Sequence, residues 1–75
     1  RTTLAAMKVP AHRLDKVGQI VSSLKQVTHN YSREGMYNLW FTLTASSAAE
    51  IKQIIGRLKK KTGIKDILNL PAEKI

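Results

Sequence analysis

The sequence predicts an α+β fold, in which a four-stranded antiparallel sheet carries two helices on one of its faces. Two observations lead to this prediction. Two long segments repeat apolar residues three and four positions apart, as one face of a helix requires. Four shorter segments have the composition of strands, and the six segments run strand, helix, strand, strand, helix, strand. That order is the split βαβ, or ferredoxin-like, arrangement.

The length and composition indicate one small domain, residues 1–75, with a thin core. The chain has 75 residues, of which 43% are hydrophobic and 24% charged, as in ordinary folded domains. A chain of this size buries little more than about 60% of its unfolded surface. It has no cysteine, so disulfides and thiolate-bound metals cannot support the core. We therefore expect a partner chain to contribute to its stability.

The charge balance favours an anionic partner. Thirteen Lys and Arg against five Asp and Glu give a formal net charge of +8. Nucleic acid, anionic lipid and a polyanionic small molecule all fit this charge, which does not choose among them. No apolar stretch reaches the roughly 18–20 residues of a membrane span, and no signal peptide is recognisable. We therefore expect a soluble, cytoplasmic protein that does not enter a membrane.

The first strand and the first helix occupy the start of the chain. Residues 2–9 are expected to form a strand that stops at Pro10, because proline has no backbone N–H to donate to a sheet. A helix is expected over residues 11–25, where the apolar residues form a single stripe. The stripe consists of Leu14, Val17, Ile20, Val21 and Leu24.

A hairpin is expected next. Residues 27–33 form a strand rich in Val, Thr and Tyr, and residues 34–36 form a turn that contains Gly35. Residues 37–45 give the strongest strand signal in the chain. On this strand Tyr37, Leu39, Phe41 and Leu43 share one face, and Asn38, Trp40, Thr42 and Thr44 share the other.

The second helix is expected over residues 47–62. Ser47 and Glu50 have the spacing of a capping box, which satisfies free N–H groups at a helix start. Gly63 is expected to end the helix in the left-handed conformation. Its apolar stripe consists of Ile51, Ile54, Ile55 and Leu58. A last strand follows at residues 64–70, and Pro71 is expected to interrupt it.

This fold leaves one sheet face without helices. Leu39, Phe41 and Leu43 are the better candidates for the helix-facing side, which puts Trp40 on the open side. A tryptophan there is either part of an interface with another chain or the wall of a ligand site. The thin core and this aromatic residue together predict a dimer formed through the sheet.

One row of side chains could carry chemistry. His29, Tyr31 and Arg33 lie on one face of the second strand, because side chains alternate along a strand. An imidazole, a phenol and a guanidinium in one row could bind an anionic ligand and move a proton. The alternative is an ordinary half-exposed polar face, and spacing alone favours this alternative. The other histidine, His12, is interpreted as a solvated surface residue.

Other sites receive little support. The sequence has no Cys nucleophile, no Gly-rich phosphate loop and no His/Asp/Glu group at metal-ligand spacing, so no metal site is predicted. The run Lys59, Lys60 and Lys61 could contact phosphate, but a solvated helix end is the favoured interpretation. An RNA-binding domain of this fold stacks bases on aromatic residues of its two central strands. Residues 2–9 contain none, which argues against RNA binding.

Three segments carry a resemblance that covers nearly the whole chain. LAAMKVP, VTHNYSREGMYNLWFTLTA and TGIKDILNLPAEKI, in this order and spacing, resemble the siroheme decarboxylases of the alternative haem and haem d1 pathways. The THNYxR…YNLWFT part is the most specific. That family is similar in fold to the Lrp/AsnC-type transcription regulators, in which a helix-turn-helix precedes a ferredoxin-like ligand domain. The resemblance therefore implies a fragment that lacks an N-terminal helix-turn-helix and a C-terminal strand. The ending at residues 73–75 is expected to fall within a strand.

The resemblance also implies a reaction: removal of CO₂ from two acetate side chains of sirohaem to give didecarboxysirohaem. The iron is part of the substrate, and no separate cofactor is implied. His29 matches the motif histidine and is expected to be the catalytic proton donor, while Arg33 matches the motif arginine and would hold a carboxylate. Tyr31 would orient the substrate and Trp40 would pack against the macrocycle. The partner chain would be an identical or a paralogous subunit.

Two competing functions remain open at the sequence level. The domain could be the effector-binding and dimerisation domain of an Lrp/AsnC-type regulator, with DNA as the partner of a separate helix-turn-helix. It could also serve dimerisation alone. The row formed by His29, Tyr31 and Arg33, together with YNLWFT, favours the decarboxylase, because an amino-acid sensor has no need of it.

Overall fold

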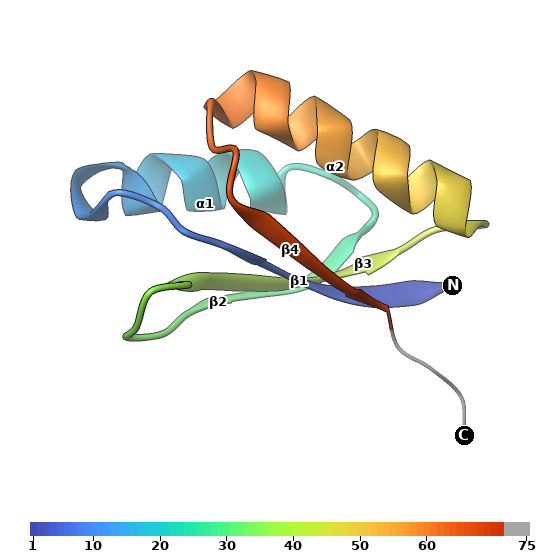
Figure 1. Cartoon of the computed structure of the whole chain (residues 1–75), viewed down its shortest axis with the longest axis horizontal. Coiled ribbons are helices and arrows are strands. Elements are labelled where there is room, and N and C mark those ends of the chain that lie inside the picture. The colour runs from blue at the N-terminus through green and yellow to red at the C-terminus, as the bar shows by residue number, and fades with distance from the viewer. Residues whose placement is uncertain (72–75) are drawn as a thin grey trace.

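The computed structural model of the protein describes residues 1–71. Its elements follow the expected order, with one short 3₁₀ turn ahead of the first helix (Figure 1). In chain order they are β1 (Thr2–Met7), η1 (Ala11–Arg13), α1 (Leu14–Ser22), β2 (Val27–Ser32), β3 (Leu39–Thr44), α2 (Ala48–Thr62) and β4 (Ile67–Pro71).

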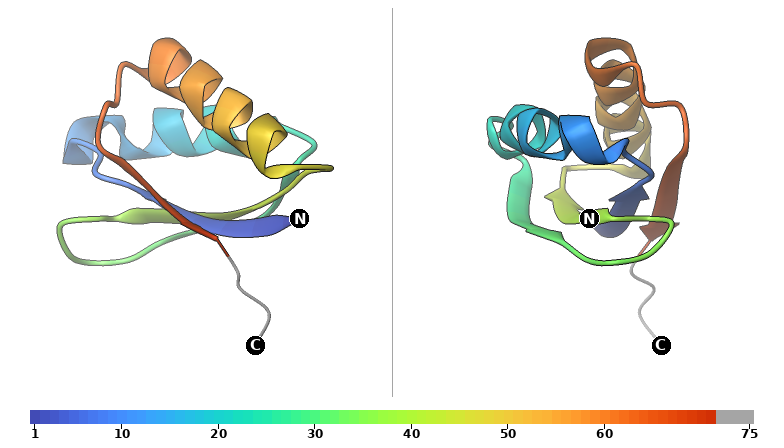
Figure 2. Two further views of the ribbon diagram at one scale, coloured as in Figure 1. Left: turned by 45° about the vertical axis from the view of Figure 1, so that its right-hand side comes forward. Right: turned by 90° about the vertical axis from the view of Figure 1, so that its left-hand side faces the viewer.

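The four strands form one sheet in the order β2-β3-β1-β4. Every neighbouring pair is antiparallel. Both helices lie on the same side of this sheet, and the other side carries neither of them (Figures 1 and 2). The predicted fold class is therefore confirmed: a four-stranded antiparallel sheet with two helices on one face.

The core lies between the sheet and the helices. Phe41 at the centre of β3 and Met7 on β1 are fully buried. The helices contribute the predicted stripes, of which Val17, Val21, Ile51, Ile54, Ile55 and Leu58 are buried. Leu14 and Leu24 pack against this core from its margin and stay partly exposed. The apolar spacing therefore predicted correctly which side of each helix faces the sheet.

The first helix is shorter than its predicted range of 11–25. Its first turn is 3₁₀, with the Arg13 N–H bonded to the Pro10 carbonyl at 2.9 Å, and α1 itself ends at Ser22. The apolar spacing continues to Leu24, but Leu24 packs against the core from the turn that follows the helix. Its carbonyl accepts a bond from the Val27 N–H at 3.1 Å, which leads the chain into β2.

The strands are shorter than predicted because side chains replace main-chain pairing at one end of the sheet. Both β1 and β3 stop short of the pair formed by Val9 and Asn38. The Asn38 side chain accepts from the Val9 N–H at 2.9 Å and donates to the Val9 carbonyl at 2.8 Å. This amide thus does the work of one further backbone pair. At the other end of the chain, β4 begins at Ile67 rather than residue 64, and Ile64 is buried in the core.

Pro71 was expected to interrupt the last strand, and this prediction is wrong. Pro71 is the final residue of β4, opposite Thr3 of β1. Proline is tolerated there because β4 is an edge strand, which needs only one side of its backbone for pairing. The expectation that residues 73–75 fall within a strand lies outside the described residues.

Ser47 caps the start of α2 as predicted, but the Glu50 side chain bonds Ser46 rather than Ser47. The Ser47 hydroxyl accepts from the Glu50 N–H at 3.1 Å, as a capping box requires. The Glu50 carboxylate, however, accepts from the N–H and the hydroxyl of Ser46, at 2.9 and 2.6 Å. These bonds lower the pKa of the Glu50 carboxyl. The helix ends at Gly63, whose φ of 74° is the left-handed conformation that glycine adopts without strain.

The bonds at Glu50 predict a pH-dependent loss of stability. A carboxyl whose pKa is lowered by folding stabilises the fold above its ordinary pKa and loses this contribution as the pH falls through the lowered value. In Glu50→Gln, the free energy of unfolding should fall below that of the wild type at about pH 7, and the gap should close at about pH 2. Urea unfolding at both pH values measures this difference. Glu34→Gln removes the same charge from the exposed β2–β3 turn and is the control; an equal loss in this variant would contradict the account.

Candidate functional site

The face of the sheet that no helix covers is here called the open face (Figure 2). Because Leu39, Phe41 and Leu43 of β3 are buried under the helices, Trp40 and Thr42 point to the open face. The strand register extends this face across the sheet in two rows. One row contains Tyr31, Trp40, Ala6 and Leu68, and the next contains His29, Thr42, Leu4 and Leu70.

A β-bulge places His29 in the second row. The register of β2 against β3 shifts between Val27 and His29, so that Val27 lies opposite Leu43 while His29 lies opposite Thr42. Without the extra residue, Thr28, the two side chains would point to the same face. The bulge lets Val27 pack against the core while His29 stays exposed on the open face.

Arg33 joins this surface from the end of β2. Its N–H donates to the Asn38 carbonyl at 3.0 Å, which continues the pairing of β2 and β3 by one residue. The Arg33 guanidinium carbon lies 5.2 Å from the centroid of the Trp40 ring, which is within the range of a cation–π contact. The Arg33 guanidinium and the Trp40 indole are therefore in contact with each other on the open face.

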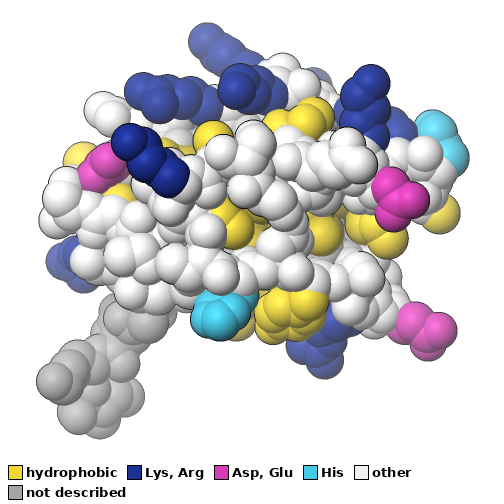
Figure 3. Space-filling model, turned by 180° about the vertical axis from the view of Figure 1, so that it is seen from behind, with side chains coloured by type: hydrophobic (Ala, Val, Ile, Leu, Met, Phe, Trp, Pro, Cys, Tyr) yellow, Lys and Arg dark blue, Asp and Glu magenta, His cyan; other side chains and the backbone are white. Residues whose placement is uncertain are grey.

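The structure thus brings all four predicted site residues to the same face. Tyr31 is 44% exposed and stands opposite the half-buried Trp40, while His29 and Arg33 are exposed. On the side of the molecule opposite the helices, Figure 3 shows a histidine beside hydrophobic side chains, with Lys or Arg next to them. His29 and Tyr31 are two positions apart on one strand, or about 7 Å. This arrangement offers an aromatic surface, one cation and one imidazole to the same ligand.

Two further residues of this end of the sheet were missed from the sequence. Tyr37 was expected on the helix-facing side of a strand, but it lies just before β3 and its hydroxyl donates to the Asp66 carboxylate at 2.8 Å. This bond and the charge of Asp66 raise the pKa of the Tyr37 hydroxyl. The Tyr37 carbonyl in turn accepts from the Trp40 indole N–H at 2.7 Å. Strand alternation predicted Tyr37 and Trp40 on opposite faces of one strand, and the sequence pattern carries no signal of either bond.

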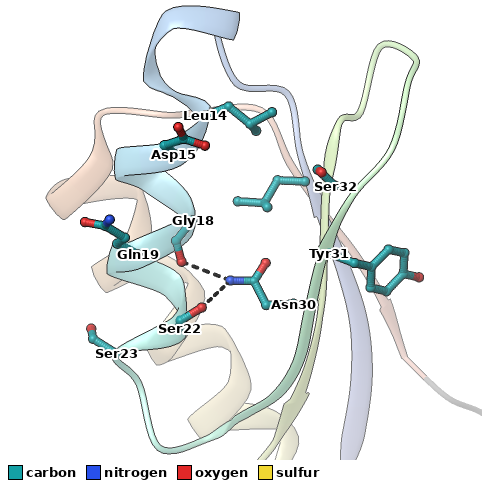
Figure 4. A pocket seen from close by; sticks show the side chains of 10 residues that line it. Leu14, Asp15, Gly18, Gln19, Ser22, Ser23, Asn30, Tyr31 and Ser32 are labelled. Atoms are coloured by element: carbon teal, nitrogen blue, oxygen red, sulfur yellow. Dashed lines mark hydrogen bonds between the residues drawn. The ribbon is translucent and has the colours of Figure 1, made fainter.

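A groove of about 590 Å³ lies elsewhere, between α1 and β2. Asn30 spans it, donating to the Gly18 carbonyl at 2.9 Å and to the Ser22 hydroxyl at 2.6 Å (Figure 4). The Tyr31 side chain points away from it in the same view. Its one charged lining residue is Asp15, and of the predicted site residues Tyr31 lines it while His29, Arg33 and Trp40 do not. The groove therefore suits an anionic ligand less well than the open face.

Neither metal binding nor membrane spanning has support in residues 1–71. No three His, Cys, Asp or Glu side chains of this part of the chain come together as a metal site would require. Neither α1 nor α2 has the length and the apolar run of a membrane-spanning helix.

A family model described as the AsnC-like ligand binding domain matches residues 1–75. The chain belongs to this family. Among solved structures, TTHA0845 from Thermus thermophilus superimposes with a TM-score of 0.89 at 20% identity, over 99% of this chain and 94% of that one. At such low identity the likeness concerns the fold alone.

Curated relatives are more similar to the chain in sequence than TTHA0845 is. The chain is 42% identical over 72 residues to the siroheme decarboxylase NirD subunit of Pseudomonas aeruginosa, covering 96% of this chain and 47% of the relative. It is 45% identical over 75 residues to the siroheme decarboxylase alpha subunit of Oleidesulfovibrio alaskensis, covering 100% of this chain and 45% of the relative. The chain thus spans about half the length of these relatives.

One solved structure connects the AsnC-like fold to a ligand. The siroheme decarboxylase NirDL, crystallised in complex with an iron-uroporphyrin III analogue, superimposes with a TM-score of 0.86 at 32% identity. The match covers 95% of this chain and 24% of that one.

The contact between Arg33 and Trp40 predicts a measurable change in the fluorescence of the only tryptophan in the chain. Arg33→Ala should raise the quenching of Trp40 by acrylamide, because the guanidinium covers one face of the ring. It should also lower the free energy of unfolding by about 0.5–1 kcal/mol, the size of an exposed cation–π contact. Arg57→Ala removes the same charge from an exposed position of α2 and is the control. Unchanged quenching in Arg33→Ala would show that the stacked geometry does not persist in solution.

Proposed function

We propose that this chain is the AsnC-like domain of a siroheme decarboxylase and that its open face binds sirohaem. The observation that carries the proposal is the collection of His29, Tyr31, Arg33 and Trp40 on one uncovered sheet face. It is supported by the 42–45% identity to siroheme decarboxylase subunits over nearly the whole chain. The reaction would take place in the cytoplasm.

The composition of the open face matches a polycarboxylate tetrapyrrole. A flat macrocycle needs an apolar or aromatic surface, and the half-buried Trp40 and Leu68 provide one, with the fully buried Ala6 between them on β1. Acidic side chains at the rim of the macrocycle need cations, and the Arg33 guanidinium, which lies over the Trp40 ring, provides one. The net charge of +8 also favours the approach of such an anion. Tyr31 beside Trp40 would orient the ring.

The chemistry assigned to His29 is proton delivery. Loss of CO₂ breaks the bond between the methylene carbon of an acetate side chain and its carboxylate, and the electron pair stays on the methylene carbon. That carbon must take up a proton to become a methyl group. An imidazole suits this step because its ordinary pKa lies near neutral pH. The iron enters with the substrate, and the proposal needs no separate cofactor.

The proposal also includes a second chain on the open face. Leu70, at the β4 end of this face, is 45% exposed, and Leu68 and Leu4 lie beside it. An apolar strip of this kind on a small domain favours coverage by a partner. A dimer through the sheet would enclose the macrocycle between two chains, which are identical or paralogous subunits.

The direct test is conversion of sirohaem. The full-length protein with its partner subunit is mixed with sirohaem without oxygen, and the product mass is followed. The proposal expects the loss of two CO₂ and the appearance of didecarboxysirohaem. A protein that leaves sirohaem unchanged but binds a small effector and DNA would instead be an Lrp/AsnC-type regulator.

Two substitutions separate the roles on the open face. His29→Ala should lower kcat by about 10²–10⁴-fold, as expected for loss of a general acid, with KM changed little. Arg33→Ala should raise KM by about 10–100-fold, because it removes a charge-assisted contact with the substrate. Steady-state kinetics of the full-length enzyme measures both effects. If His29→Ala decarboxylates sirohaem at the wild-type rate, His29 is not the proton donor.

The proposed interface gives a further prediction. Leu70→Glu should shift the protein toward monomer, because it places a charge in the apolar strip. Met36→Glu is the matched control, since Met36 is 66% exposed but lies on the β2–β3 turn. Light scattering across a concentration series measures the association. A wild-type protein that remains monomeric up to millimolar concentration would contradict the dimer.

A further inference from the structure

One chain of contacts runs from the turn before β4 to the open face, through Asp66, Tyr37, Trp40 and Arg33. It begins where the Tyr37 hydroxyl donates to the Asp66 carboxylate at 2.8 Å, across 29 positions of sequence. Asp66 is itself held in place, because its carbonyl accepts from the Lys8 N–H at 3.2 Å. The segment between β2 and β3 is thereby fastened to the turn before β4.

The same tyrosine holds the tryptophan. The indole of Trp40 has one N–H, and this group donates to the Tyr37 carbonyl at 2.7 Å. A side chain with only two rotatable bonds and one fixed hydrogen bond has little freedom left. The Arg33 guanidinium then stands 5.2 Å from the ring centroid. The position of Tyr37 therefore governs the position of both the aromatic surface and the cation.

The bond between Tyr37 and Asp66 is not needed for the core. Tyr37 lies outside β3, half-buried, and Asp66 is exposed on the turn before β4. The hydrogen bond to Asp66, burial and the negative charge of Asp66 all raise the pKa of the Tyr37 hydroxyl. Charge-assisted bonds of this kind are stronger and more directional than neutral ones.

We infer that Tyr37 and Asp66 are positioning residues that hold Trp40 and Arg33 in the arrangement required to bind an anionic tetrapyrrole. The inference rests on the proposed function and adds two residues that do not themselves touch the substrate in it. Their effect is to raise the fraction of molecules whose open face is ready to bind, and apparent affinity scales with that fraction.

The expected result is a change in affinity without a change in chemistry. In the full-length protein with its partner subunit, Tyr37→Phe should raise the Kd for iron uroporphyrin III and the KM for sirohaem by about 3–10-fold, the effect of one hydrogen bond. The kcat should stay within about twofold of the wild type, because His29 is unaffected. Asp66→Ala should match Tyr37→Phe, and Asp66→Asn should restore most of the affinity, since its amide oxygen still accepts the phenol proton.

A double-mutant cycle separates positioning from general destabilisation. If Tyr37 acts through the stacked pair, Tyr37→Phe should cost much less affinity in an Arg33→Ala background than in the wild type. Glu50→Gln is the control for destabilisation, because it removes the charge that strengthens the bonds from Ser46 at the start of α2 and should leave KM unchanged.

The outcomes distinguish this inference from the function on which it rests. A wild-type protein that binds neither iron uroporphyrin III nor sirohaem overturns the proposed function and the inference together. A wild-type protein that binds, with Tyr37→Phe binding equally well, overturns the inference alone. Equal losses from Tyr37→Phe with and without Arg33 would also overturn it.

Discussion

The alternation of side chains along β3 is the constraint on which the rest of the structure depends. β3 is one of the two central strands, and its buried residues Leu39, Phe41 and Leu43 pack under both helices. A slip of one residue in its register would exchange this apolar set with Trp40 and Thr42. The cost of exposing Phe41 and its neighbours therefore fixes the open face. The candidate site is thus positioned by the core on the other side of the same strand.

The sequence was sufficient to predict the parts that follow from periodicity. The period of three and four assigned Val17 and Ile54 to the core, and the period of two put His29 and Tyr31 on one face. These patterns arise because the buried face of each helix or strand selects apolar residues along its whole length, so they are visible in the sequence. The order of elements then left one sheet face uncovered, as the structure bears out.

Features that depend on one local irregularity or one side-chain contact could not be predicted from the sequence. The bulge at Thr28 leaves no mark in a pattern of alternating residues, although it allows Val27 and His29 to face opposite sides. The Asn38 amide shortens two strands by replacing a backbone pair. The bond from Tyr37 to Asp66 joins residues 29 positions apart, which no local pattern reports. The roles of the open-face residues remain a prediction.

We have proposed the open face, rather than the groove between α1 and β2, as the surface that receives the tetrapyrrole. An anaerobic crystal structure of the full-length protein and its partner with sirohaem tests this most directly. The account predicts the macrocycle against Trp40, a carboxylate within hydrogen-bond distance of Arg33, and an acetate side chain beside His29. A macrocycle bound in the groove lined by Asp15 and Asn30, with the open face empty, would contradict it.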